Sequence, residues 1–287
     1  MLRISAVRFP ASVGRPTATA RPSIDVEMLR HAQVIGSAVF YTAVGLLVLA
    51  AIWQVASLIA GKDLPNPIAT LAVFGQLLAN PFYDKGPNDK GIGLQLVSSL
   101  GRVGAGFALA SALAIPVGFL MGANATSRKI LYPIVQIMRP VSPLAWFPIG
   151  LAAFQSAGTA TIFVIFMTSI WPTLINTAFG VMSLPDDHRN VARVFRFSRL
   201  KYVTKVLLPY SMPHILTGLR LSMGVAWMVI VAGEMLAGGT GIGFFVWDSW
   251  NALSLEKVLS AILIIGGVGL ILDRAFEWAG QRFSYGS

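Results

Sequence analysis

The sequence contains no cysteine, little charge and only three histidines. Without cysteine there is no disulfide and no thiolate metal site, and the three histidines lack the spacing of zinc ligands, so no metal site is expected. Asp, Glu, Lys and Arg make up 12% of the 287 residues, whereas a soluble domain carries about 25%. Because 55% of the residues are hydrophobic, the surplus apolar surface is expected to face lipid rather than a protein core.

Motifs of nucleotide-binding proteins and enzymes are absent as well. No GxxxxGK[ST] phosphate loop occurs, so ATP would have to bind to another protein, and no cofactor is expected on this chain. The glycine run Gly238–Gly243 does not fit G-x-G-x-x-G and predicts a tight re-entrant turn. No Ser/His/Asp set or metal cluster supports an enzyme. The net charge of +10 does not indicate nucleic acid as a partner, because the basic residues lie at the ends of apolar runs.

The apolar residues form six runs, and a helix of about 20 such residues crosses the hydrocarbon of a bilayer. The runs cover residues 34–60, 96–121, 130–154, 161–184, 206–232 and 258–272. No residue between 141 and 185 is charged, and the polar stretch 155–160 divides this region into two spans. The third run contains Pro140, Pro143 and Pro148, which predict a kinked or broken helix. The sequence therefore predicts an all-α polytopic membrane protein with six transmembrane helices.

The distribution of basic residues orients these spans. Residues 1–30 are polar and arginine-rich and are expected to form a flexible cytoplasmic tail, followed by a transmembrane domain over residues 31–287. Lysine and arginine outnumber acidic residues in the tail, in the turn at 128–129 and in the segment 186–209. With six spans these regions and the end of the chain share one side, which the basic excess marks as cytoplasmic. Both termini are thus predicted to lie in the cytoplasm.

The segment Asp186–Pro209 carries six basic residues in an otherwise apolar chain. On a helix its basic and apolar side chains would separate to opposite faces. The basic face would carry Arg189, Arg193 and Arg196, and the apolar face would carry Val191, Val194 and Phe195. Ser198 is expected to begin a second short helix that runs into the fifth span. Such a segment suits either a basic loop that touches anionic lipid or a docking helix, at about 186–200, whose apolar face a cytoplasmic partner covers.

This segment resembles the coupling loop of binding-protein-dependent ABC transporter permeases, whose pattern is E-A-A-x3-G-x9-I-x-L-P. The matching positions are Asn190, Val191, Ala192, Arg193, Val194, Phe195 and Arg196, and then Val206 to Pro209. The spacing is intact, and the resemblance implies that these residues couple the chain to an ATPase. Asn190 replaces the acid of the pattern and Arg196 replaces its glycine. Since a left-handed residue other than glycine costs about 1–2 kcal/mol, Arg196 predicts a turn without left-handed backbone.

Other motifs narrow the resemblance to one branch of these permeases. RPVSPLAWFPIGL (139–151), TGLRLSMGVAW (217–227) and AGEML (232–236) are similar to the nitrate/sulfonate/bicarbonate branch. NPFYDKGPNDKGIGLQL (80–96), NVARVFRFSR (190–199) and GTGIGFFVWDSWN (239–251) are most similar to nitrate-type permeases. The resemblance implies a type I ABC importer core like that of methionine permeases. It also implies a small inorganic anion as substrate, with nitrate or nitrite first and bicarbonate, cyanate and sulfonate as open alternatives.

Partners follow from the same resemblance. It implies a homodimer of this chain in the bacterial inner membrane, two cytoplasmic ATP-binding subunits and a periplasmic substrate-binding protein. A stand-alone anion channel, a secondary transporter and a membrane enzyme are the competing classes. The two halves of the chain show no obvious repeat, and the spans carry no ladder of ionisable residues for proton coupling, which argues against a secondary transporter.

Arg102, Arg139 and Arg220 lie near or within predicted spans. A charge inside the membrane is costly and usually has a function, so each arginine is a candidate for the anion pathway. Alternatively, each extends to the interface or pairs with an acid near a helix end. Glu234, just beyond the fifth span, is expected to be either structural or part of a gate.

Overall fold

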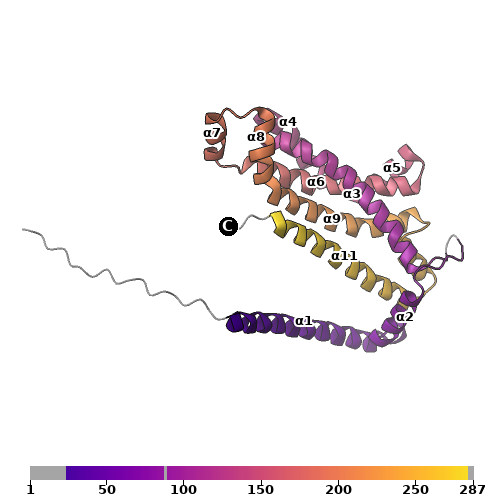
Figure 1. Cartoon of the computed structure of the whole chain (residues 1–287). Coiled ribbons are helices and arrows are strands. Elements are labelled where there is room, and N and C mark those ends of the chain that lie inside the picture. The colour runs from indigo at the N-terminus through magenta and orange to yellow at the C-terminus, as the bar shows by residue number, and fades with distance from the viewer. Residues whose placement is uncertain (1–23, 87–88, 284–287) are drawn as a thin grey trace, which may run out of the picture. The chain divides into compact units, whose positions relative to one another are not determined.

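The computed structural model describes residues 24–86 and 89–283, and these are helical apart from turns and one bridge between Asp84 and Lys90. The chain divides into two units, residues 1–59 and 60–287, which are described separately. The described part of the first unit belongs to helix α1 (Ile24–Ala60) (Figure 1). Residues 1–23 of the predicted tail lie outside the described residues, and α1 begins within the last part of that tail.

Ten further α-helices follow in the described part of the second unit. Their bounds are α2 (Pro67–Ala79), α3 (Ile92–Ala123), α4 (Ala125–Met138), α5 (Phe147–Phe154), α6 (Ala157–Met182), α7 (Asp186–Val194), α8 (Arg199–Tyr202), α9 (Leu208–Ala237), α10 (Ile242–Asn251) and α11 (Leu255–Phe283). Short 3-10 helices lie at Gly61–Asp63 and Pro143–Trp146, and a π-helical turn at Val203–Leu207 joins α8 to α9.

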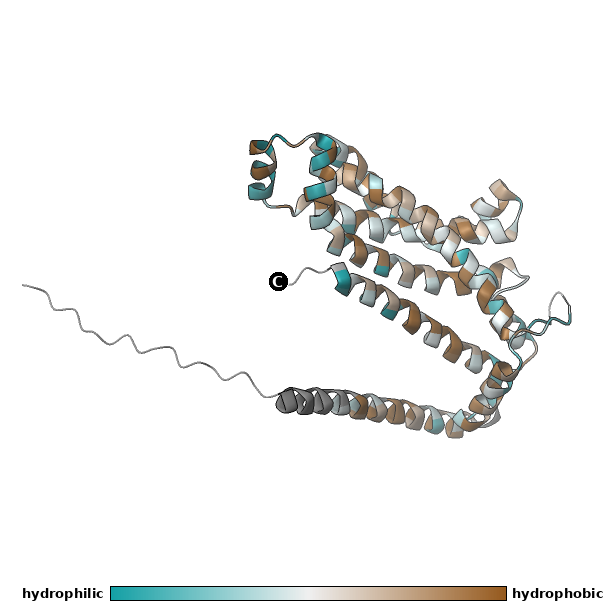
Figure 2. Cartoon of the chain, in the orientation of Figure 1, coloured by the Kyte–Doolittle hydropathy of each residue, from teal (hydrophilic) through white to brown (hydrophobic). Residues whose placement is uncertain are grey.

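Five helical segments of the described residues are long and apolar enough to cross a membrane. They are Val39–Ala60, Ile92–Ala123, Ala157–Met182, Arg199–Ala237 and Leu255–Arg282. A sixth consists of α4 and the segment Pro143–Phe154, which meet at a bend of 96°. The six predicted spans are therefore confirmed with the bent pair counted as one, and the third is broken as its prolines predicted. Apolar residues dominate the spans, whereas hydrophilic residues gather at α7 and α8 (Figure 2).

Helix α6 packs against both α3 and α9 and forms the centre of the second unit. Small residues recur at four-residue intervals along α3: Gly106, Ala110, Ala114, Gly118 and Gly122. A Cβ atom at Gly118 would lie 2.7 Å from Cβ of Thr177, and one at Gly122 would lie 2.6 Å from Cβ of Val181. The two backbones can approach this closely only because glycine lacks a side chain. Close packing of this kind is a main source of helix association in lipid.

The contact between α6 and α9 combines small residues with hydroxyl groups. The Ser222 hydroxyl donates to the carbonyl oxygen of Ser169 at 2.6 Å and lies 2.7 Å from the Thr173 hydroxyl. A Cβ atom at Gly218 would lie 2.9 Å from Cβ of Asn176. The hydroxyl groups of Ser222 and Thr173 are thus satisfied across the two helices, and α6 packs closely against both of its neighbours.

Helices α9 and α11 run antiparallel. Trp227 on α9 donates its indole N–H to the carbonyl oxygen of Ile265 at 3.0 Å, while Arg220, earlier on α9, pairs with Asp273, later on α11. The start of α9, with α7 and α8, therefore lies at the same end of this unit as the end of α11, and α10 lies at the other end (Figure 1). This arrangement agrees with the charge pattern, which assigned the basic segment and the end of α11 to one side.

The close packing of α3 on α6 can be tested with two glycines of α3, Gly118 and Gly104. Gly118→Ala should lower the thermal unfolding midpoint of the detergent-solubilised chain, because overpacking a contact costs about 1–3 kcal/mol. Gly104 lies on α3 with no atom within 4 Å of the position of its Cβ. Gly104→Ala is thus the matched control and should leave the midpoint unchanged or raise it. Equal midpoints for both variants would contradict the close contact.

Candidate functional site

Helix α7 forms the first part of the basic segment. It follows Pro185, carries Asp186 and Asp187 in its first turn and ends at Val194. Acidic side chains favour a helix N-terminus, where the helix dipole is positive, and Arg189 also pairs with Asp186 at 3.7 Å on the exposed surface. The predicted short helix is confirmed, and its second half presents the residues that match the coupling pattern.

The apolar side chains of this segment are uncovered in the single chain. Val191, Val194 and Phe195 are 54%, 78% and 70% exposed, whereas Ala192 is only 5% exposed. Ala192 faces hollows that are lined by Phe197, Tyr202 and Val206, whereas Val194 and Phe195 are left largely uncovered. Large side chains this exposed on a polar segment are typical of an interaction surface.

The turn after α7 corrects the prediction made for Arg196, because this residue has a φ of 48° and is left-handed. The Arg196 N–H donates to the carbonyl oxygen of Arg193, and the Phe197 N–H donates to that of Ala192, each at 3.0 Å. Together these bonds form the Schellman arrangement that usually places glycine at the left-handed position. They satisfy carbonyl groups at the helix end and so offset the conformational cost of about 1–2 kcal/mol. The turn therefore keeps the geometry of the family pattern without its glycine.

The same turn also corrects the predicted basic face. Because α7 ends at Val194, only Arg189 and Arg193 lie on the helix, and Arg196 belongs to the turn. Asn190, which replaces the acid of the pattern, accepts a hydrogen bond from Arg193 at 3.4 Å. Arg189 and Arg193, joined by Arg199 and without Arg196, line one surface hollow of about 340 Å³. Its other lining residues are Ala192, Phe197 and Tyr202.

The connection from this turn to the fifth span is one continuous helical segment. Ser198 caps α8 by accepting the Lys201 N–H at 3.3 Å, as predicted. The helical residues then run from Arg199 to Ala237, a length of 39 residues. Pro209 follows the π-helical turn Val203–Leu207 within this segment, and such a local adjustment accommodates the missing backbone N–H of a proline. A displacement of the basic segment would therefore be carried directly into α9.

Arg102 pairs with Glu234. Of the two interpretations of this arginine, an anion pathway or a pair with an acid near a helix end, the structure shows the pair. The Arg102 guanidinium nitrogen lies 2.6 Å from the Glu234 carboxylate, which is fully buried. Ser99 Oγ lies 2.7 Å from the same carboxylate, and the Gly243 N–H donates to it at 3.0 Å. These contacts of Glu234 join α3, α9 and the start of α10.

The Arg102–Glu234 pair also shapes the glycine-rich turn between α9 and α10. The side chain of Gln95 accepts the Gly241 N–H at 2.6 Å, and Arg102 donates to the Thr240 carbonyl oxygen. Gly241 has a φ of 150°, and a Cβ atom there would overlap the Glu234 carboxylate. The predicted tight turn is confirmed. Gln95 and Ser99 were missed, although both lie on the Arg102 face of the second span at helical spacing.

Arg220 also has acidic partners. It makes a bidentate pair with Asp273, with both nitrogen to oxygen distances at 2.6 Å, and Glu277 lies 3.5 Å away. This pair joins α9 to α11. Asp273 follows the predicted sixth span (258–272), and α11 continues past this span to Phe283.

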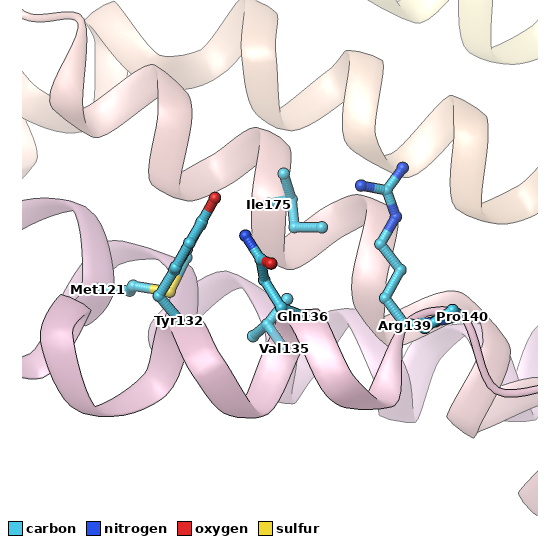
Figure 3. A pocket seen from close by; sticks show the side chains of 7 residues that line it. All are labelled: Met121, Tyr132, Val135, Gln136, Arg139, Pro140 and Ile175. Carbon is cyan, nitrogen blue, oxygen red and sulfur yellow. The ribbon is translucent and has the colours of Figure 1, made fainter.

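Arg139 differs from the other two arginines because it makes no ion pair within the described part of the chain. It follows the last residue of α4, at the break of the third span, and it lines a cavity of about 530 Å³. Tyr132, Gln136 and Arg139 extend from one side of α4 toward Ile175 of α6 (Figure 3). Tyr132 and Gln136 were missed, although they precede Arg139 by seven and three residues on one helical face.

Comparisons with known proteins agree with this arrangement. Residues 114–285 match the family described as binding-protein-dependent transport system inner membrane component. The nitrate import permease protein NrtB of Synechocystis sp. is 45% identical over 81% of this chain and 84% of its own length. The bicarbonate transport system permease protein CmpB of Synechococcus elongatus is 45% identical over 82% of this chain and 85% of its own length.

The fold also has a counterpart among solved structures. The MetNI methionine ABC transporter, in inward-facing conformations, contains a chain that matches with a TM-score of 0.59 at 13% identity. The match covers 65% of this chain and 93% of that one, and it confirms the predicted methionine-permease-like core. The chain therefore belongs to the family of binding-protein-dependent transport system inner membrane components, as a multi-pass permease subunit of an ABC importer.

Proposed function

We propose that this chain is the permease subunit of an ATP-driven importer of nitrate or the closely similar nitrite. The observation that carries this proposal is that the segment 186–198, with its exposed apolar and basic side chains, leads directly into a continuous 39-residue helix. It occurs in a chain that is 45% identical to a nitrate import permease. Bicarbonate is the second candidate, because a bicarbonate permease is equally similar. Cyanate and sulfonate are further alternatives implied by resemblance.

The energy for transport is supplied by separate ATP-binding subunits in this proposal. Val191, Val194 and Phe195 would enter an apolar groove on such a subunit, and Arg189 and Arg193 would meet acidic residues at its rim. Buried apolar anchors with a polar rim are the usual composition of a stable protein interface. ATP binds to the partner, and this chain contributes no cofactor site and no catalytic residue.

Assembly and orientation complete the proposal. Two copies of this chain form a homodimer in the bacterial inner membrane, each gripped by one of two ATP-binding subunits. Both termini lie in the cytoplasm, in line with the basic residues of the segment 186–209 and its position beside the end of α11. A periplasmic binding protein delivers the anion at the opposite end, where α10 and the glycine-rich turn lie.

Transport by the assembled complex tests this function. Proteoliposomes that contain the permease and its ATP-binding partner, supplied with the binding protein, should accumulate isotope-labelled nitrate against its gradient only with hydrolysable ATP. Permease alone is the control, and it should move no nitrate. Rapid nitrate flux through permease alone would favour a channel instead. Accumulation of labelled bicarbonate, with nitrate neither carried nor competing, would favour the second candidate substrate.

The exposed apolar residues predict where the ATP-binding subunit attaches. Phe195→Asp should reduce co-purification of that subunit by about tenfold or more, because burying an unpaired carboxylate at an interface costs several kcal/mol. Leu253 is 86% exposed and lies at the far end of the unit, after α10. Leu253→Asp is therefore the matched control and should leave co-purification unchanged. Full recovery of the partner with the Phe195 variant would contradict the docking assignment.

The left-handed turn makes a second prediction for this segment. Arg196→Gly and Arg196→Ala both remove the charge, but only glycine relieves the left-handed strain, by about 1 kcal/mol. Amide hydrogen exchange over residues 191–197 should thus be about fivefold slower in the glycine variant than in the alanine variant. Equal exchange rates would mean that Arg196 is not left-handed in the assembled transporter.

A further inference from the structure

Among Arg102, Arg139 and Arg220, Arg139 is the one that has no acidic partner in the described chain, and it lines a cavity together with the polar side chains of Tyr132 and Gln136. Arg102 and Arg220 are neutralised by Glu234 and Asp273. An arginine inside a membrane is rare unless it has a partner, a water-filled cavity or a function. Because no acidic residue of the described chain pairs with Arg139, its counter-charge must come from elsewhere.

The depth of Arg139 makes this counter-charge important. Helix α4 has 14 residues and is about 21 Å long, which is less than the thickness of a hydrocarbon layer of about 30 Å, so Arg139 lies within the span that α4 begins. The span then bends by 96°. The cavity of about 530 Å³ is large enough for an ion with several waters, since a water occupies roughly 30 Å³. An ion could therefore enter without losing its whole hydration shell.

The side chains around the cavity match the chemistry of a small oxyanion. The guanidinium group of Arg139 is planar and can donate two parallel hydrogen bonds to two oxygens of one ion. Gln136 lies one helical turn before Arg139, and its amide adds further donors. Tyr132 lies one turn earlier still and adds a hydroxyl group. The polar ends of the three side chains extend to the same side of α4 (Figure 3).

The remaining walls of the cavity are apolar. Met121 of α3, Val135 of α4 and Ile175 of α6 line it beside the polar side chains. Tyr132, Gln136 and Arg139 are exposed in the single chain, so an ion can reach the guanidinium group from the open side of the cavity. The apolar walls offer no acidic group that would repel the ion. The site has one positive charge and therefore favours a monovalent anion.

We propose that Tyr132, Gln136 and Arg139 form a binding site inside the membrane for a small monovalent oxyanion. This inference rests on the proposed function and deepens it, because it names the residues that hold the anion on its way through the permease. Arg139 binds the ion directly, Gln136 adds a second contact, and Tyr132 offers the next contact toward the start of α4. Nitrate and bicarbonate share this chemistry, and the experiment separates them.

The absence of cysteine from the chain allows a direct test in the assembled transporter. Gln136→Cys introduces the single thiol of the permease, which is then labelled with a negatively or a positively charged methanethiosulfonate and resolved from its partners on a gel. The labelling rate with the negative reagent should exceed the rate with the positive one. Arg139→Gln in the same Gln136→Cys chain should lower the ratio of these two rates about tenfold, which corresponds to about 1.4 kcal/mol. Nitrate should slow the negative reagent, and parallel arms use bicarbonate and chloride.

Two matched controls come from the same helix. Ile134 lies on the opposite face of α4 and is 51% exposed, so Ile134→Cys should show neither the charge preference nor protection by nitrate. Arg128→Gln removes a positive charge from the first turn of α4 and should leave the labelling ratio at position 136 unchanged. If Arg128→Gln and Arg139→Gln lower the labelling ratio equally, the preference comes from the overall positive charge of the helix and not from a site at Arg139, and the proposal is overturned.

Uptake by the same variants separates this proposal from the proposed function. Introduced alone, without Gln136→Cys, Arg139→Gln should lower nitrate uptake at least tenfold. The binding protein should still stimulate ATP hydrolysis by the assembled transporter. Normal uptake by Arg139→Gln overturns the site and leaves the function standing. Anion preference and protection by nitrate without ATP-driven uptake would support the site and reject the function. Labelling that is insensitive to nitrate and to bicarbonate would assign Arg139 to lipid phosphates and overturn the site.

Discussion

The close contact of α6 with α3 on one side and α9 on the other is the constraint on which the second unit depends. Lipid supplies no hydrophobic force between helices, so they must hold together by surface contact and by hydrogen bonds. Gly118 and Gly122 allow the first contact, and Ser222 with Thr173 secures the second. Three spans joined in this way move as one body. A force applied at the start of α9 is therefore shared by α6 and α3.

Charges in the same unit are arranged by a second constraint, which is the cost of burying an ion without a partner. Glu234 is fully buried, and the cost is offset by Arg102, by Ser99 and by the Gly243 N–H. These contacts fix the turn between α9 and α10. The Arg220–Asp273 pair does the same for α9 and α11 near the opposite end. The paired charges therefore reinforce the helix contacts, and of Arg102, Arg139 and Arg220 only Arg139 keeps a charge that no acidic residue of the described chain neutralises.

Features that depend on neighbouring residues could be predicted from the sequence. The break of the third span follows from proline chemistry at Pro140 and Pro143, and the start of α8 follows from the capping oxygen of Ser198. The left-handed turn at Arg196 was missed because the prediction counted the strain of the residue and not the two backbone hydrogen bonds that the turn gains. In that case local geometry was decided by the helix end rather than by residue preference.

Contacts between distant residues could not be predicted in the same way. Glu234 is 132 positions from Arg102, and Asp273 is 53 positions from Arg220, and neither spacing has a helical period. The choice between a pathway role and a structural role for these arginines therefore had to wait for the fold. Gln136 and Tyr132 are different, because their spacing to Arg139 is helical. A search for polar side chains on the face of each intramembrane arginine would have found them.

These contacts also connect the two proposed sites mechanically. The basic segment continues through Pro209 into α9, and α9 is bonded to α6 at Thr173 through Ser222. Ile175, two residues further along α6, is a wall of the cavity beside Arg139. A movement imposed on α7 by an ATP-binding subunit is therefore carried by α9 and α6 to this wall. Val135 of α4 packs in the same buried cluster as Leu174 and Ala178 of α6, and α4 also contacts α3, so the helices that line the cavity belong to the same packed group. The proposed docking segment and the proposed anion site are therefore joined through one packed group of helices, which is the physical link that alternating access to a bound anion requires.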